Sequence, residues 1–401
     1  MSTNSTCQSG NGHARLSARQ SDEGRRIIHQ LNEMALNGLP QMFNAEKQLF
    51  CHKLKKFPSG VAQEGLSPRY TMMTLMGFHR VEQNGGTAPF ASKPIFENLL
   101  ADTSWITNVG DLGLLVWTCA LLEPARLPEL SRQLDVKNAM ARYSNSKQNC
   151  TVHLSWLLGG LSHATLANPE MSAGFQALAA EIYSRLLRNQ GDEGFFGSYA
   201  KNASLVGFIR GEIGSFADQV YPIYSFTRYA QAFGDAKATE RALDCALAIC
   251  EVQGSLGQWW WHYNAASGRV INGFPVFSVH QHGMAPMALL ALGEEIQSDF
   301  SPWIQKGISW ISNNELAYEM RDFNVNVVWR CIERPEAHKY WNAMMEMLTQ
   351  RDHRESRHNL KVLHECRPYE LGWLLYAFAA KDAELSSIQL EKPAVAAVQG
   401  R

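Results

Sequence analysis

The stretch Gln190–Phe196 reads QGDEGFF, and the stretch Gln253–Trp259 reads QGSLGQW, 63 residues further along the chain. Each stretch follows an amphipathic run that is typical of a helix, Phe175–Asn189 in the first copy and Ala238–Val252 in the second. A partial third copy, Lys306–Ile311, reads KGISWI. A turn that recurs after a helix at a nearly constant spacing indicates a fold built from repeated helix hairpins.

Six other segments carry small and apolar residues around most of their circumference, which indicates buried helices. They are Tyr70–Val81, Asp111–Leu122, His153–Ala167, Asp218–Phe233, Gly283–Leu292 and Tyr369–Ala380. Amphipathic helices such as Lys237–Val252 alternate with them. This alternation predicts an all-α fold, an (α/α)6 toroid of inner and outer helices; an open solenoid of the same helix pairs is the alternative. The best strand candidate, Arg269–Phe277, predicts a short β-hairpin inserted in a loop.

The composition indicates one globular domain. Of 401 residues, 45% are hydrophobic and 19% charged, and the formal net charge is −1. We expect a single catalytic toroid over residues 23–381, a disordered segment over 1–22 and a C-terminal tail over 382–401. The near-neutral charge argues against a nucleic-acid partner, and no apolar run is long enough for a membrane span. Eight cysteines without a CxxC pair, and no apolar leader, predict a reduced, cytoplasmic protein.

The recurring pattern, Gln-x3-Gly-x-aromatic, resembles the QW motif of the terpenoid cyclase and protein prenyltransferase toroids. It is also similar to turns in six-hairpin carbohydrate-active enzymes, which include unsaturated glucuronyl hydrolases and sugar epimerases. The block Phe216–Pro222, FADQVYP, is similar to the helix start of those hydrolases, where an Asp precedes an aromatic residue and a Pro. The chain lacks the Asp-x-Asp-Asp acid of class II terpenoid cyclases, and Val220 stands where prenyltransferases have a zinc-binding Cys. The resemblance implies the toroid and leaves the substrate open.

The starts of the inner helices carry candidate catalytic residues, and a toroid gathers these starts at one mouth. Asp218 begins one inner helix, followed by Gln219, a candidate ligand for substrate, and Tyr221, a candidate catalytic residue. A carboxylate in this position either caps the helix or acts as a general acid or base. His280 and His282 stand in a Gly- and Pro-containing loop before another inner helix. We predict that one of them partners Asp218, while a structural role is the alternative for one of the two.

Three consecutive tryptophans, Trp259, Trp260 and Trp261, precede His262 and Tyr263. Three neighbouring side chains cannot all face one core, because successive residues diverge on a helix or a strand. We therefore predict that this segment provides a stacking platform, since an indole ring packs against sugars and carbocations alike. The alternative for two of the three is a packing role between hairpin and ring.

The last inner helix is preceded by Glu365 and Arg367 and begins near Tyr369. The guanidinium of Arg367 suits a carboxylate or phosphate on a substrate. Further candidate ligands for substrate are Glu365, Tyr369 and Gln281, which stands between the two histidines. No metal site is predicted, because the histidine pair has no Asp, Glu or Cys partner at the usual spacing. No cofactor motif is present either.

These residues favour a cytoplasmic enzyme that acts by acid–base chemistry on a sugar or a uronate-containing glycan, through hydrolysis, elimination or epimerisation. Its partner is a small molecule or oligosaccharide. A terpenoid cyclase-like enzyme with an isoprenoid substrate in an aromatic cavity is the first alternative, and a ring that binds a ligand without catalysis is the second. The sequence does not indicate an oligomeric state.

Overall fold

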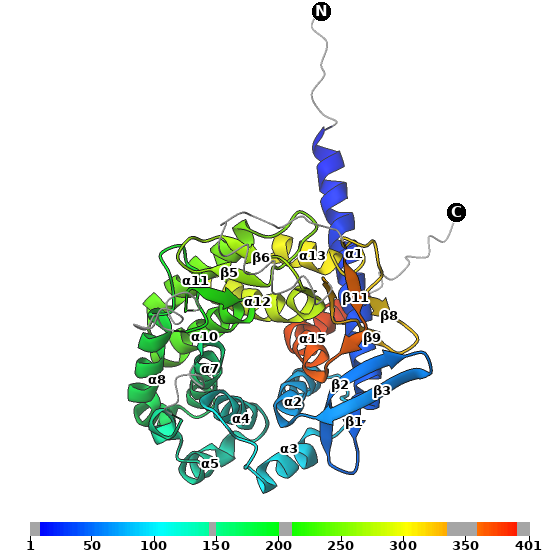
Figure 1. Ribbon diagram of the computed structural model, residues 1–401. Helices are drawn as coiled ribbons and strands as arrows, with labels where there is room; N and C mark the ends of the chain where they lie inside the picture. The colour runs from blue at the N-terminus through cyan, green and yellow to red at the C-terminus, as the bar shows by residue number, and fades with distance from the viewer. Residues whose placement is uncertain (1–8, 144–149, 200–210, 335–358, 391–401) are drawn as a thin grey trace, which may run out of the picture.

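The computed structural model describes residues 9–143, 150–199, 211–334 and 359–390, and its helices form a closed ring (Figure 1). Each inner helix packs against the next, and the last packs against the first, so the predicted toroid is confirmed and the open solenoid is excluded. The inner helices are α2 (Pro68–Gln83), α4 (Val109–Leu122), α7 (Thr151–Ala167), α10 (Ala217–Phe233), α12 (Ala285–Ile296) and α15 (Pro368–Leu390). All six predicted inner segments overlap these helices, although the fifth begins as a π-helix, η6 (His280–Met284).

The outer layer consists of one helix beside each inner helix. It is formed by α1 (Ser9–Gly38), α3 (Ser92–Ala101), α5 (Leu127–Gln133), α8 (Ser172–Leu187), α11 (Ala236–Glu251) and α13 (Ser301–Ser309). A one-turn helix, α6 (Ala139–Arg142), lies between α5 and α7. The outer helices carry one apolar stripe, whereas the inner helices are covered on both sides; α4, for example, is buried from Val109 to Ala120.

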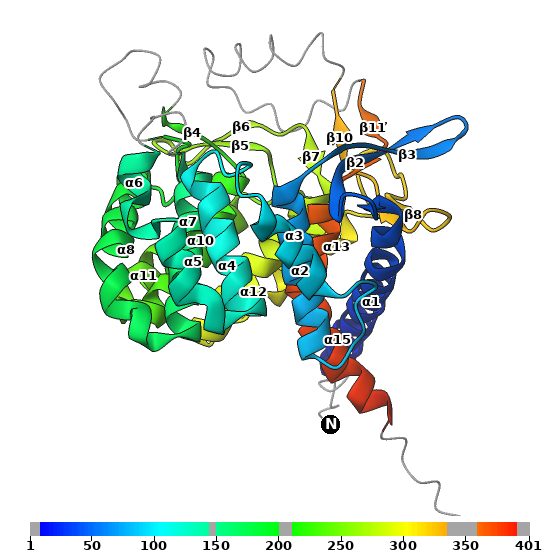
Figure 2. The ribbon, with the colours of Figure 1, turned by 90° about the horizontal axis from the view of Figure 1, so that it is seen from below.

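Antiparallel strands gather at the end of the ring where the inner helices begin (Figure 2). One sheet has the order β1 (Phe43–Asn44), β2 (Leu49–Phe57), β12 (Glu365–Cys366), with β3 (Gly60–Leu66) also paired to β2. A second sheet has the order β11 (Lys361–Leu363), β10 (Cys331–Glu333), β7 (Val276–Phe277). A third has the order β4 (Ile213–Ser215), β5 (His262–Asn264), β6 (Val270–Asn272). The fourth pairs β8 (Arg321–Asp322) with β9 (Val327–Val328). This end of the ring is therefore its structured mouth.

The β-hairpin predicted for residues 269–277 is wrong. Its two halves are strands of different sheets, because β6 pairs with β5 and β7 pairs with β10. Between them stands Pro275, which has no backbone N–H to donate to a ladder. The segment thus joins two sheets across the mouth.

The helical layer also extends further at both ends than predicted. Helix α1 begins at Ser9, so residues 9–22, predicted to be disordered, are helical, and α15 continues to Leu390 rather than ending at residue 381. Leu31, Ala35 and Leu39, in and just after α1, are fully buried. A helix nucleated by such packing extends one residue at a time into a less apolar segment. Residues 1–8 and 391–401 lie outside the described residues.

The two repeated turns make the same hydrogen bonds. The side-chain amide of Gln190 donates to the backbone oxygen of Gly194 at 3.1 Å, and that of Gln253 donates to the oxygen of Gly257 at 3.1 Å. Each amide also donates to a backbone oxygen of the next outer helix, at 3.0 Å in both copies. The QW-like glutamine therefore joins successive hairpins.

The glycine of each turn is required by its backbone and by its neighbours. Gly194 and Gly257 have φ angles of +84° and +97°, which favour glycine. A Cβ atom would lie 2.8 Å from the backbone oxygen of Asp244 at the first glycine and 1.9 Å from that of Lys306 at the second. These turns build the ring and carry no information about substrate, so the likeness to terpenoid cyclases is one of architecture.

Candidate active site

Strands β4 and β5 bring the start of α10 next to the tryptophan-rich segment. Ser215 pairs with His262 in this ladder, and the backbone N–H of Phe216 donates to the backbone oxygen of Trp261 at 2.8 Å. Two segments that are distant in the sequence thereby meet at the mouth. Asp218, the second residue of α10, follows this junction directly.

Asp218 is buried, and its hydrogen-bond donors among the described residues are all uncharged. Its Oδ2 accepts from the hydroxyls of Ser198 at 2.8 Å and Ser215 at 2.7 Å, and from the backbone N–H of Ser215 at 2.8 Å. Its own backbone N–H donates to the Ser215 hydroxyl at 3.3 Å, which is a capping box. Burial raises the pKa of Asp218, and the hydrogen bonds from Ser215 and Ser198 oppose this shift. The residue is thus both a helix cap and a carboxyl group that favours its protonated form.

Two other acidic residues occupy the equivalent position of an inner helix, and both have an arginine partner. Asp111 accepts from Arg69 at 2.6 and 2.9 Å. Glu370 forms a buried ion pair with Arg330 and accepts from the backbone N–H of Arg367 at 3.1 Å. An adjacent guanidinium favours the charged carboxylate, whereas hydroxyl donors do so less strongly. Among the acidic residues described at these helix starts, Asp218 differs by its uncharged environment.

The two predicted histidines lie inside the ring wall. His280 and His282 are part of the π-helix η6 rather than of a loop, and burial lowers the pKa of each to about 3. His280 packs between Phe216 and Phe277, with ring centroids 4.5 and 5.1 Å away. His282 is 0% exposed. Both rings are neutral near pH 7 and are unsuited to donate a proton as imidazolium. No described contact joins either ring to Asp218, so the predicted catalytic pairing is not observed.

The three consecutive tryptophans differ in burial, as expected for neighbouring side chains that point in different directions. Trp259 is 0% exposed, and Trp260 is 3% exposed with its Nε1–H donating to the backbone oxygen of Val252 at 2.8 Å. Trp261 is only half-buried and stacks on His262 with centroids 4.1 Å apart. The platform predicted for this segment is thus available only at Trp261, because Trp259 and Trp260 pack between hairpin and ring. Tyr263 is fully buried.

Gln219 and Gln281 have matching structural roles in neighbouring hairpins. Gln219 accepts from the backbone N–H of Phe196 at 2.7 Å and donates to its backbone oxygen at 2.9 Å. Gln281 accepts from the N–H of Trp259 at 3.3 Å and donates to the oxygen of Phe277 at 3.2 Å. Both amides are 0% exposed, so we revise the predicted role in substrate binding to one of holding the repeated turns.

Tyrosines and an arginine line the mouth at the start of α15. The hydroxyl of Tyr70 accepts from Nη1 of Arg367 at 2.8 Å, and its ring lies 4.6 Å from that of Tyr369. Arg367 is half-buried, and its Nε–H has no hydrogen-bond partner. Tyr221 accepts from Nε1 of Trp373 at 3.0 Å, and burial raises its pKa, so its hydroxyl stays protonated. These residues place tyrosine rings and a guanidinium near the starts of α2, α10 and α15.

Glu365, predicted to bind substrate, is paired within the protein. Its carboxylate accepts from Nζ of Lys53 at 2.9 Å, and Lys53 also contacts Glu64 at 3.1 Å. Arg330 was not predicted. It lies over the Phe277 ring, 4.8 Å from the centroid, besides pairing with the carboxylate at the start of α15. Arg330 lies just before a short strand, where no helical pattern marks it. The carboxylate that pairs with Arg330, Glu370, does have a sequence signal. It follows Arg367 at the same i, i+3 spacing at which Asp218 follows Ser215.

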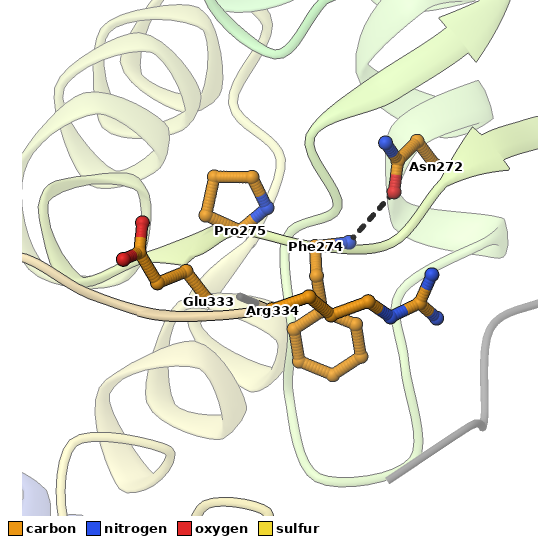
Figure 3. Close-up of a pocket in the computed structure, with 5 residues that line it drawn as sticks. All are labelled: Asn272, Phe274, Pro275, Glu333 and Arg334. Atoms are coloured by element: carbon orange, nitrogen blue, oxygen red, sulfur yellow. Dashed lines mark hydrogen bonds between the residues drawn. The ribbon is translucent and has the colours of Figure 1, made fainter. Parts of the chain in front are cut away.

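A small cleft adjoins the mouth between β6, β7 and β10 (Figure 3). Asn272, Phe274, Pro275, Glu333 and Arg334 line it, and Arg334 covers the Phe274 ring 5.4 Å from its centroid. Its empty volume of about 240 Å³, which includes space open to solvent, is below the roughly 300–1,000 Å³ of a small-molecule site. The cleft is therefore a feature of the rim. Over the described ranges we find no cluster of metal-ligating side chains and no helix that meets the length and hydropathy of a membrane span.

Comparison with known proteins identifies the architecture. No protein-family model and no curated protein match the sequence. An unsaturated glucuronyl hydrolase specific for heparin is 15% identical, with 93% of this chain and 100% of that one covered, at a TM-score of 0.51. The Bacillus enzyme of the same name, responsible for the degradation of glycosaminoglycan, is 14% identical over 92% and 97% of the chains at 0.55. A sugar epimerase from a ruminal bacterium is 9% identical over 90% and 99% at 0.59. At these identities the shared property is the toroid.

Proposed function

We propose that the protein is a carbohydrate-active enzyme that hydrolyses a uronate-containing glycan with Asp218 as its general acid and base. One observation carries the proposal: Asp218 is a buried carboxyl group at the mouth, and within the described residues its hydrogen-bond partners are hydroxyls and backbone N–H groups rather than an arginine. Such a group keeps its proton to a higher pH than an exposed aspartate and delivers it to a substrate. The shared toroid of glucuronyl hydrolases supports this reading.

In the proposed reaction the carboxyl of Asp218 gives its proton to the glycosidic oxygen, whose bond to the sugar carbon breaks as the rest of the glycan leaves as an alcohol. The carboxylate that remains is stabilised in place by the hydroxyls of Ser198 and Ser215, which already point at its Oδ2. A water molecule then adds to the electron-poor sugar carbon and returns a proton to Asp218. The proton balance closes without a cofactor.

Substrate recognition is assigned to Arg367 and Trp261. Arg367 has a guanidinium that is not paired with any described carboxylate and a free Nε–H, which together suit the two oxygens of a uronate. The half-buried indole of Trp261 offers an apolar face for a sugar ring. Tyr221 and Tyr369 would form the floor beneath the sugar.

The test measures turnover of glycan fragments that end in an unsaturated uronate. The reaction is monitored by the loss of the ultraviolet absorbance of the uronate double bond. Saturated uronate oligosaccharides, neutral oligosaccharides and isoprenyl diphosphates form the comparison set. We expect turnover of one of the uronate sets and none after the substitution Asp218→Asn. Cyclised hydrocarbon products, or full activity of the Asn variant, would overturn the proposal.

A further inference from the structure

A second polar cluster lies inside the ring, away from the mouth. It comprises Arg80 of α2, His163 of α7, Tyr224 and Arg228 of α10, and Tyr376 of α15. Arg228 is ten residues beyond Asp218 along α10, a rise of about 15 Å toward the opposite end of the ring. Helices α2 and α10 face each other across the ring (Figure 1). The two arginines therefore approach the centre from opposite sides.

Hydrogen bonds connect the middle of this cluster. Nε2 of His163 lies 2.9 Å from the hydroxyl of Tyr224, which lies 2.7 Å from the hydroxyl of Tyr376. The guanidinium of Arg228 is 5.1 Å from the centre of the Tyr224 ring, and that of Arg80 is 4.9 Å from the centre of the Tyr376 ring. Because the two hydroxyls touch, both guanidinium groups flank one short stretch of the interior.

The cluster holds more positive than negative charge. Arg228 donates to the amide oxygen of Gln231 at 2.8 Å, and the carboxylate of Glu294 is near enough to act on it electrostatically. No described carboxylate acts on Arg80 in this way. The Nε–H groups of both arginines are buried and have no hydrogen-bond partner. The pKa of His163 is held well below its usual value, first by burial and then by these two positive charges, so the imidazole stays neutral and adds no third positive charge. Two partly buried cations with only one nearby carboxylate are costly for a folded protein.

We propose that Arg80 and Arg228 form a binding site for a small oxyanion, a phosphate, sulfate or carboxylate group, at the end of the ring opposite the mouth. The two arginines are half-buried rather than sealed, so an anion reaches them from solvent. An oxyanion would satisfy the two Nε–H groups and cancel the repulsion between the guanidinium groups. The site is independent of the proposed glycan reaction, because its residues are about three helical turns from Asp218.

The experiment measures the melting temperature of the full chain against increasing inorganic phosphate at constant ionic strength, with sodium chloride as the reference salt. We expect a saturable rise with phosphate, as for any ligand that binds only the folded state. Arg80→Gln and Arg228→Gln should each weaken the apparent affinity about tenfold or more, which corresponds to loss of a charge-assisted hydrogen bond. Parallel titrations with sulfate and glucuronate, made in the Arg367→Gln variant so that the mouth does not contribute, identify which oxyanion the site prefers.

Two controls locate the effect. Arg185→Gln removes an arginine that pairs with Glu181 on the outer helix α8 at 2.7 Å, and Arg367→Gln removes one at the mouth; both variants should keep the phosphate response. If Arg80→Gln does not fold, Arg80→Lys replaces it, which keeps the charge but loses the planar fork. A phosphate response that is absent, that survives both cluster substitutions, or that disappears in Arg367→Gln would overturn the proposal.

Discussion

The substitution Asp218→Asn separates the catalytic from the capping role of this residue. Asparagine has nearly the same shape, and its Oδ1 still accepts hydrogen bonds from Ser198 and Ser215, which donate to Asp218 at 2.8 and 2.7 Å. It cannot exchange a proton. Because the native partners are uncharged, the change leaves no buried cation without its counter-ion, and we expect a loss of about 1 kcal/mol in the free energy of unfolding.

The expected loss of activity is far larger. Removal of a general acid lowers kcat by about 10²–10⁴-fold, or about 3–5 kcal/mol in the activation free energy. KM should change little, because Asp218 is not assigned to substrate binding. Stability should also depend on pH in a defined direction. Since burial raises the pKa of Asp218, the folded state holds this proton more tightly than the unfolded chain does. The wild-type protein should therefore lose stability relative to Asp218→Asn as the pH rises from about 4 through the raised pKa.

The assay pairs steady-state kinetics on unsaturated uronate disaccharides with urea unfolding from pH 4 to 8, and Asp111→Asn is the matched control. Asp111 occupies the equivalent helix start but pairs with Arg69, whose side chain is 34% exposed. Its loss should cost about 2–3 kcal/mol of stability, because an arginine is left unpaired in a partly buried position. If Asp218→Asn unfolds as easily as Asp111→Asn, or turns substrate over at the wild-type rate, the reasoning is refuted.

Three further predictions concern the turns, the platform and the ring wall. Gly257→Ala should lower the free energy of unfolding in urea by more than about 2 kcal/mol, because φ is +97° and the added Cβ would lie 1.9 Å from a backbone oxygen. Its control, Gly234→Ala, has a φ of +73° with nothing within 4 Å of the added Cβ and should lower it by about 1 kcal/mol. Trp261→Ala should raise KM about tenfold with little loss of stability. Trp260 is buried, so Trp260→Ala should lower the free energy of unfolding by about 3–5 kcal/mol. The reverse pattern would contradict the assignment of the platform to Trp261. Burial lowers the pKa of His282 to about 3, so the free energy of unfolding of the wild-type protein should fall as the pH drops from about 6.5 toward 3. In the same assay, His282→Asn should make this pH dependence less steep, by one proton taken up on unfolding.

The candidate site was only partly visible in the sequence. Asp218, Arg367 and Trp261 were predicted because they stand at helix starts or in an unusual aromatic run, and they remain in the proposed site. Gln219 and Gln281 were interpreted as ligands, although both are buried and hold the turns. A polar side chain near a helix start has the same sequence signature whether it faces a ligand or a backbone amide, and only its direction distinguishes the two cases.

The ring itself was determined by the sequence. Helical periodicity and the Gln-x3-Gly-x-aromatic turn are local properties, and each hydrogen bond of Gln190 or Gln253 within the turn depends on residues four positions away. What only the tertiary structure decided is the electrical environment of each carboxyl group. Asp111 and Asp218 follow the same spacing after a cap, yet one meets an arginine from a neighbouring helix start and the other meets serine hydroxyls. The protonation of a buried acid depends on charges and burial contributed by distant parts of the chain, so the turns specify the ring, and its closure specifies the chemistry at the mouth.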